Sequence, residues 1–167
     1  MFFDDEVQAR ASEVLAACRA RGLKVATAES LTGGAIAAAL TELAGASDVV
    51  ERGFVVYSWE AKTQLLGVPW ALLEAHGAVS EAVARAMALG ALSAGHPRVQ
   101  LTVAATGVAG PGPSEGKPAG TVHLACARGG SLETAHRALA YGASGRDAVR
   151  RAAVLDALGM LLACAEG

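Results

Sequence analysis

Apolar residues recur every three or four positions along the first stretch of the chain, which is the spacing of one face of an α-helix. Acidic residues open this stretch, arginines close it, and Gly22 follows directly, as expected at the two ends of a helix. The pattern therefore predicts an amphipathic helix over Asp4–Arg21, with a buried face made of Val7, Ala11, Val14, Leu15 and Cys18.

Shorter apolar runs, rich in β-branched residues, predict strands further along the chain. Strands are expected at Lys24–Ala28, at about Gly53–Tyr57, at Val99–Gly107 and on both sides of an Arg-Gly-Gly turn within residues 120–140. The run at 99–107 is of the kind that is buried on both faces. Helices are expected from a cap at Thr32 to about Ala44, at Glu60–Leu66, at Pro69–His76, after Ser80, and from about Gly145 to Ala163.

Helices that alternate with strands, followed by a late hairpin, favour an α/β fold. The predicted architecture is a three-layer α/β/α sandwich with a mixed, mostly parallel sheet. The chain has 167 residues, a length that suits one domain over residues 1–167. Hydrophobic residues make up 53% of the chain and charged residues 18%, which excludes a disordered or fibrous protein.

Charge and hydropathy indicate which kinds of molecule the protein binds. The net charge is −2, and lysine and arginine form no run or stripe, so nucleic-acid binding is not expected. The first residues are acidic and no apolar segment is long enough to span a bilayer, so we expect neither a signal peptide nor a membrane partner and predict a cytoplasmic protein. A small anionic ligand held by one or two cations is compatible with this composition.

The cysteines and histidines are dispersed along the chain. Cys18, Cys126 and Cys164 are odd in number and lie in apolar stretches, which is typical of reduced core thiols. The four histidines show no close pairing, so no metal site is expected.

The segment "VATAESLTGG" ends a predicted strand on Glu29 and Ser30 and then places Gly33 and Gly34 at the start of a predicted helix. If Thr32 caps that helix, the free amides of the glycines point back toward Ser30. Such amides stabilise either a phosphate or the oxyanion formed when a serine attacks a carbonyl. A plain capped turn with an incidental Ser and Glu is the alternative, and the spacing does not decide between these readings.

A serine nucleophile needs a base, and the motifs of the familiar serine hydrolases are absent from this sequence. Lys62 is the candidate, because it lies in the first turns of a predicted helix just after the strand that ends at Tyr57. A lysine in a dry pocket has a lowered pKa and can accept the proton of a serine. A solvated Lys62 and an incidental strand-end tyrosine are the alternatives.

Two further segments bring candidate binding groups. In "ATGVAGPG", Thr106 and Gly107 end the most apolar predicted strand, and the glycines offer backbone donors at a sheet edge. If Ser144 caps the last helix, Arg146 stands in its first turn, where a cation suits an anionic ligand. The alternatives are a surface loop and a salt bridge from Arg146 to a nearby acid.

The motifs "TAESLTGG", "GFVVYSWEAKTQLLGV", "AATGVAGPG", "GKPAGTVHLA" and "SGRDAVR" together resemble the CinA C-terminal domain family. The family includes nicotinamide mononucleotide (NMN) deamidases. The resemblance implies an α/β/α fold, a homodimer, and hydrolysis of the carboxamide of NMN to nicotinate mononucleotide and ammonia. It implies no metal or organic cofactor.

The resemblance also implies roles for individual residues. Ser30 matches the nucleophile and Lys62 its base. The polar partners are Tyr57 and Thr106, and substrate is held by Arg146 and by the amides near Gly33, Gly34 and Gly107. Thr32 belongs to the same cradle, and Glu29 either orients a ligand hydroxyl or pairs with Lys62. Trp59 stands where the family usually has Asn, which bears on the shape of the pocket.

The alternative function is a non-catalytic nucleotide-binding or protein-interaction module that uses the same glycine turns and Arg146 as an anion site. Turnover of NMN distinguishes the two hypotheses.

Overall fold

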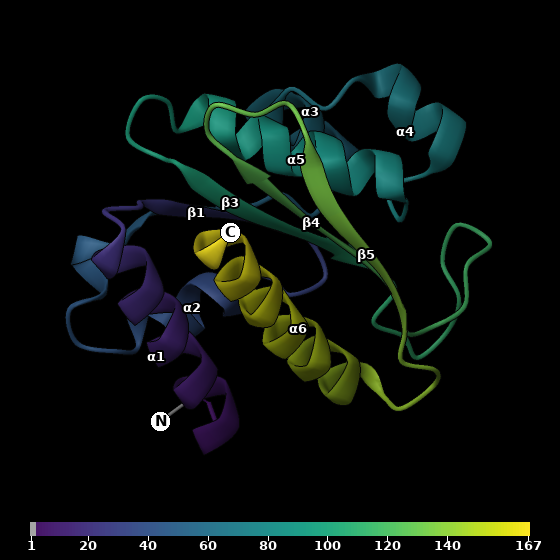
Figure 1. The fold of residues 1–167 in the computed structure, drawn as a ribbon. Coiled ribbons are helices and arrows are strands. Elements are labelled where there is room, and N and C mark those ends of the chain that lie inside the picture. Colours follow the sequence, from purple (N-terminus) through teal and green to yellow (C-terminus); the bar gives the residue numbers. More distant parts are fainter. Residues whose placement is uncertain (1–2) are drawn as a thin grey trace.

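The structure, a computed structural model, describes residues 3–167 as a single α/β domain with three layers (Figure 1). Within these residues, five strands form one sheet in the order β2-β1-β3-β4-β5. The strands are β1 (Val25–Glu29), β2 (Val50–Val55), β3 (Leu101–Gly107), β4 (Thr121–Arg128) and β5 (Thr134–Ala140). The three-layer sandwich expected from the sequence is confirmed.

The sheet is mixed. β1 pairs in parallel with β2 on one side and with β3 on the other, whereas β4 runs antiparallel to both β3 and β5. The carboxyl ends of β2, β1 and β3 therefore meet at the same edge of the sheet, where ligands commonly bind in open α/β folds.

Helices cover both faces of the sheet (Figure 1). One face carries α1 (Asp5–Ala20), α2 (Ala35–Thr41) and α6 (Arg146–Glu166), and the other carries α3 (Trp59–Leu66), α4 (Trp70–His76) and α5 (Glu81–Ala94). A short 3₁₀ helix, η1 (Ala46–Asp48), precedes β2. Because both faces are covered, every residue of β1 is buried, including the charged Glu29 at its end.

Side-chain caps start several of the helices as the sequence indicates. Asp4 accepts a hydrogen bond from the amide of Val7 at the start of α1, and Ser80 accepts one from Val83 at the start of α5. Each cap satisfies an amide that the first turn of the helix leaves without a partner.

Two predicted caps are wrong. The residue that precedes α2 is Gly34, with a φ of 95°, so the helix starts later than a cap at Thr32 would require. The last helix follows Gly145, with a φ of 97°, and Ser144 makes no cap. The strand β2 also ends before Tyr57, which lies in the connection to α3.

None of the helices in the described part of the chain is long and apolar enough to cross a membrane.

Candidate active site

The candidate site lies at the carboxyl edge of β1, β2 and β3. Ser30 directly follows β1, and its amide donates to the carbonyl of Ala105 in β3 at 2.9 Å. On the other side, the amide of Val56 donates to the carbonyl of Glu29 at 2.8 Å. These two bonds extend the sheet by one residue, so Ser30 is held by both neighbouring strands and is only 8% exposed.

Lys62 reaches Ser30 from α3, a helix that Ser58 caps. The Nζ atom of Lys62 lies 3.0 Å from Ser30 Oγ, 2.8 Å from the carbonyl oxygen of Val56 and 3.1 Å from that of Tyr57. The side chain is 1% exposed, so the alternative of a solvated lysine is wrong. The structure thus brings together the two residues that the sequence proposed as nucleophile and base.

Burial lowers the pKa of Lys62 to about 8, and the negative charge of Glu115 opposes this shift. A pKa near 8 leaves a useful fraction of the amine neutral close to neutral pH. In the neutral form, two N–H groups can remain on the carbonyls of Val56 and Tyr57 while the lone pair faces Ser30 Oγ. This geometry suits transfer of a proton from the serine to the lysine.

Glu29 has a structural role that sequence reasoning missed. Its carboxylate accepts hydrogen bonds from the amides of Gly34 at 3.0 Å, Ile36 at 3.0 Å and Ala37 at 2.9 Å. It therefore caps α2 from the end of the preceding strand, in place of Thr32. The sequence suggested that this carboxylate contacts a ligand hydroxyl or pairs with Lys62, but it is bonded to backbone amides instead.

The amides expected to be free after Ser30 are already used. The amide of Gly33 donates to Ser30 O at 3.1 Å, that of Gly34 donates to Glu29, and that of Ala35 donates to Thr32 O at 3.2 Å. By contrast, the amides of Leu31 and Thr32 donate to no acceptor within residues 3–167. The open donors next to Ser30 thus lie earlier in the turn than the sequence suggested.

Arg150 of α6 holds this turn in place. Its Nε donates to Leu31 O at 3.1 Å and its Nη2 to Thr32 O at 3.0 Å. Sequence reasoning named Arg146 and not Arg150, although a separation of four residues places both on the same face of a helix. That spacing in "SGRDAVR" was the available signal.

Thr106 and Tyr57 differ in their placement. Thr106 is buried, and its hydroxyl donates to the carbonyl of Ala78 at 2.8 Å, so it ties β3 to the segment before α5. The side chain of Tyr57 is 65% exposed and lines a small pocket. Tyr57 therefore contributes a carbonyl to Lys62 and a phenol ring to the neighbouring pocket.

The pocket beside the Ser30 edge has a volume of about 290 Å³ and is lined by Tyr57, Gly107, Gly110, Ser114 and Arg146 among others. The Nη1 atom of Arg146 donates to the carbonyl of Gly110 at 3.1 Å, which holds the guanidinium at the pocket wall. Ser30 does not line the pocket itself. It lies next to it, beyond Tyr57 and the end of β3.

The glycine- and proline-rich loop is fixed on the α3–α4 side. Trp59 Nε1 donates to Glu115 Oε1 at 2.9 Å, and its ring meets that of Trp70 edge-to-face at a centroid distance of 5.5 Å. Lys117 donates to the carbonyl of His76 at 2.9 Å. Trp59 is absent from the residues that line the small pocket, and its hydrogen bond to Glu115 connects it to the loop that supplies Ser114 to the pocket wall.

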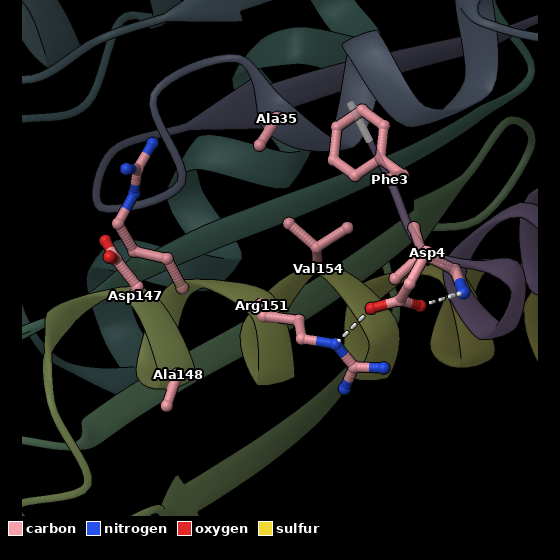
Figure 2. A pocket seen from close by; sticks show the side chains of 9 residues that line it. Phe3, Asp4, Ala35, Asp147, Ala148, Arg151 and Val154 are labelled. Carbon is pink, nitrogen blue, oxygen red and sulfur yellow. Dashed lines mark hydrogen bonds and ion pairs between the residues drawn. The ribbon is translucent and has the colours of Figure 1, made fainter. Parts of the chain in front are cut away.

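A larger cavity, of about 610 Å³, lies between the starts of α1 and α6 and is also lined by Ala35 and Arg150, next to the turn that follows Ser30 (Figure 2). Apolar side chains such as Phe3 and Val154 line it together with charged ones, and Arg151 pairs with Asp4 at 2.6 Å across its wall. No nucleophile with an adjacent base lines this cavity. The chemistry of Ser30 and Lys62, and not cavity size, marks the candidate active site.

The dispersed histidines and cysteines partly converge in the fold. Pairing of β4 with β5 places His123 Nδ1 3.0 Å from His136 Nε2. Even so, the described residues contain no group of three or more His, Cys, Asp or Glu side chains that could hold a metal ion. Cys18 and Cys126 are buried, as expected of core thiols, whereas Cys164 is half-buried.

Comparisons with known proteins identify the family and the fold of this chain. The CinA C-terminal domain profile matches residues 7–165. Nicotinamide-nucleotide amidohydrolase PncC of Escherichia coli K12 is 47% identical over 156 residues, which are 93% of this chain and 92% of that protein. A CinA-like protein of Anaeromyxobacter dehalogenans strain 2CP-C is 51% identical over 89% of this chain, which spans only 35% of that longer relative.

Comparison with solved structures also finds the same fold. The crystal structure of competence/damage inducible protein CihA from Agrobacterium tumefaciens superposes with a TM-score of 0.92 at 45% identity, covering 98% of both chains. Sequence match over nearly the whole length and a shared three-layer fold lead to one assignment: the chain belongs to the CinA C-terminal domain family.

Proposed function

We propose that the chain hydrolyses the carboxamide of NMN to nicotinate mononucleotide and ammonia, with Ser30 as nucleophile and Lys62 as base. The observation that carries the proposal is the contact of 3.0 Å between Lys62 Nζ and Ser30 Oγ in a buried site. The substrate class is supported by the relative named nicotinamide-nucleotide amidohydrolase, which is similar over almost the entire chain.

In the first half of the reaction, neutral Lys62 takes the proton of Ser30 as Oγ attacks the carboxamide carbon. The carbonyls of Val56 and Tyr57 keep the amine aimed at the serine, because they accept its other N–H groups. The protonated lysine then donates to the departing ammonia, and an acyl-serine ester remains.

The tetrahedral intermediate needs donors for its oxyanion, and we assign this role to the amides of Leu31 and Thr32. The amide that follows a nucleophilic serine is a recurrent oxyanion donor. Arg150 orients the second donor, the amide of Thr32. The carbonyl of Leu31 and the amide of Thr32 belong to one trans peptide and point in opposite directions, so the bond from Arg150 to Leu31 O fixes the direction of the Thr32 N–H. Arg150 is thus a positioning residue for the oxyanion site.

In the second half, water attacks the ester while Lys62 again serves as base, and Ser30 is regenerated. No step of this scheme uses a metal or an organic cofactor. The phosphate of the substrate is assigned to Arg146, whose exposed guanidinium stands at the wall of the pocket near Tyr57 and Gly107.

The test is release of ammonia and nicotinate mononucleotide from NMN by the purified chain. We expect Ser30→Ala and Lys62→Met to remove nearly all turnover, because each deletes a group that acts in the chemical step. Ser93→Ala, a serine in α5 far from the strand ends, serves as the matched control and should keep the wild-type rate. Near-normal turnover by Ser30→Ala would show that the covalent mechanism is wrong.

The same experiment separates the enzyme from the alternative of a non-catalytic module. Tight binding of NMN without turnover by the wild-type chain would support the module, whereas steady turnover excludes it.

A homodimer is also part of the proposal. The exposed apolar side chains Val55 (52% exposed), Leu65 (53%) and Trp70 (43%) on β2, α3 and α4 offer a surface for a second copy. Sedimentation velocity at micromolar concentration tests this, and a monomer throughout that range would contradict it.

A further inference from the structure

Two cysteines far apart in the sequence lie together on the side of the sheet covered by α6. Cys126 belongs to β4 and is 2% exposed, and half-buried Cys164 packs against the same core from the last turns of α6. The two residues line the same cavity, and their thiols lie close enough for each to shift the pKa of the other. In Figure 1 the C-terminal end of α6 lies against the sheet, as this contact requires.

Both thiols line one cavity, which has a volume of about 430 Å³ and is bounded by the β4–β5 turn and the end of α6. Polar side chains, among them Ser131 and Glu133, share its wall. Because Cys164 is half-buried, a small polar oxidant has a route from this cavity to its thiol, with Cys126 behind it. The cavity is separate from the Ser30 site: Cys126 pairs with Val103 in the middle of β3, whereas Ser30 contacts the strand near its end.

The electrostatic surroundings make the two cysteines unequal. Arg128 Nη1 donates to the carbonyl of Cys164 at 3.0 Å, which holds a positive charge close to this thiol. The pKa of Cys164 is below its usual value, because the neighbouring thiol of Cys126 and the charges of Arg128 and Arg137 favour the thiolate. The pKa of Cys126 is raised by the neighbouring Cys164 and by burial.

Cys18 provides the contrast within the same chain. It is completely buried in α1, and burial raises its pKa to about 11. A thiol of this kind reacts slowly, because the thiolate and not the thiol is the nucleophile.

We propose that Cys164 and Cys126 form a dithiol site that hydroperoxides oxidise to a disulfide. The Cys164 thiolate attacks the peroxide, the O–O bond breaks, and an alcohol or water leaves while Cys164 becomes a sulfenic acid. The sulfur of Cys126 then attacks that of Cys164, an S–S bond forms, and the hydroxyl leaves as water with the proton of Cys126. In sum, the two thiols lose two protons and two electrons, and these reduce one hydroperoxide to an alcohol or water and one further water. This proposal is independent of the proposed amidohydrolase activity.

The test is to expose the folded chain to hydrogen peroxide, block the remaining thiols with N-ethylmaleimide after denaturation, and analyse the products by mass spectrometry. We expect the mass of the oxidised chain to be about 2 Da lower than that of the untreated chain before blocking. After blocking, N-ethylmaleimide should be found on one cysteine, Cys18. Fragmentation should identify a cross-linked peptide pair that contains Cys126 and Cys164.

Variants make the assignment specific. Cys18→Ser should cross-link like the wild type. Cys126→Ser should stop at a sulfenic acid on Cys164 that dimedone traps, and Cys164→Ser should form no cross-link. In the folded wild type, Cys164 should also react with N-ethylmaleimide at least about tenfold faster than Cys18. A cross-link that includes Cys18, equal reaction rates of Cys164 and Cys18, or no cross-link after prolonged oxidation would overturn the proposal.

Discussion

At the scale of single residues, the proposed chemistry depends on a lysine that is buried without a carboxylate in contact. The three acceptors around Lys62 Nζ are two carbonyls and the hydroxyl of Ser30. Burial in such surroundings penalises the ammonium form, so the pKa falls to about 8. Glu115 limits the fall from a greater distance, held by the indole of Trp59.

This balance predicts the pH dependence of activity. Lys62 must be neutral to accept a proton, so kcat/KM should increase as the pH rises through about 8 and level off above it. Glu115→Gln should move this rise to lower pH, because it removes the negative charge that stabilises the ammonium while an amide oxygen can still accept from Trp59. Glu13→Gln on α1 is the control. An unchanged profile for Glu115→Gln would contradict the assignment.

Arg150 gives a second prediction at this scale. Arg150→Met should lower kcat by about a hundredfold with little change in KM, because the turn after Ser30 loses the bonds that orient its amides. Arg150→Lys should recover part of the rate, since an ammonium can still reach one of the two carbonyls. Arg151→Met, which affects only exposed pairs with Asp4 and Glu6, should retain the wild-type kcat. Equal losses in both methionine variants would argue for a general effect on folding.

At the scale of elements, the position of Lys62 depends on how closely α3 packs against α5. Gly90 in α5 lies under the end of α3, and a β-carbon at this position would overlap the carbonyl oxygen of Leu66. Glycine in the middle of a helix normally reduces its stability, so the close approach of the two helices accounts for its presence here.

A pair of glycine substitutions tests this packing. Gly90→Ala should reduce the free energy of unfolding by about 1–3 kcal/mol, because the steric overlap outweighs the gain of roughly 1 kcal/mol in helix propensity. Gly159→Ala in α6 is the matched control, since its β-carbon would meet only the flexible end of Arg10 at 3.7 Å. Urea titration should show this control to be unchanged or more stable. Stabilisation by Gly90→Ala would contradict the packing argument.

At the scale of the whole molecule, the site combines segments that are distant in the sequence. The turn after β1, the connection from β2 to α3, the end of β3 and the first turns of α6 all meet at one sheet edge. The hydrogen bond from Arg150 to Leu31 alone spans 119 positions of the chain. The candidate site is therefore a property of the assembled fold.

The phosphate of the substrate provides a prediction at this scale. Arg146→Ala should raise KM for NMN by roughly tenfold to a hundredfold, the usual loss for one hydrogen bond to a charged group. The same variant should barely change KM for nicotinamide riboside, which has no phosphate. Arg98→Ala, at a remote exposed arginine, serves as the control. An equal effect of Arg146→Ala on both substrates would place the phosphate elsewhere.

Much of the fold could be predicted because its signals are local. Apolar periodicity located α1, β1, β3 and α5, acidic residues marked the start of α1, and the capping residue Ser80 marked the start of α5. The chain order of strands and helices indicated that Ser30, Lys62 and Gly107 would share an edge, since parallel strands place their carboxyl ends together.

The errors concern groups whose partners are remote or unexpected. Thr32 has the residue type of a cap, yet Glu29 takes that role because its carboxylate reaches the amide of Gly34 and two amides in the first turn of α2. Because Glu29 is the cap, α2 begins later than the sequence suggested. The amides that stay free beside Ser30 are therefore different from those expected.

The sequence by itself determined the α/β class, the element order, and the kinds of residue that end at one edge of the sheet, because each follows from local periodicity and turn chemistry. Only the tertiary structure decided that Lys62 is buried and touches Ser30, that Arg150 holds the following turn, and that Cys126 and Cys164 meet. The physical reason is that burial, pKa and hydrogen-bond partners depend on segments brought together by packing, and local sequence does not encode which segments those are.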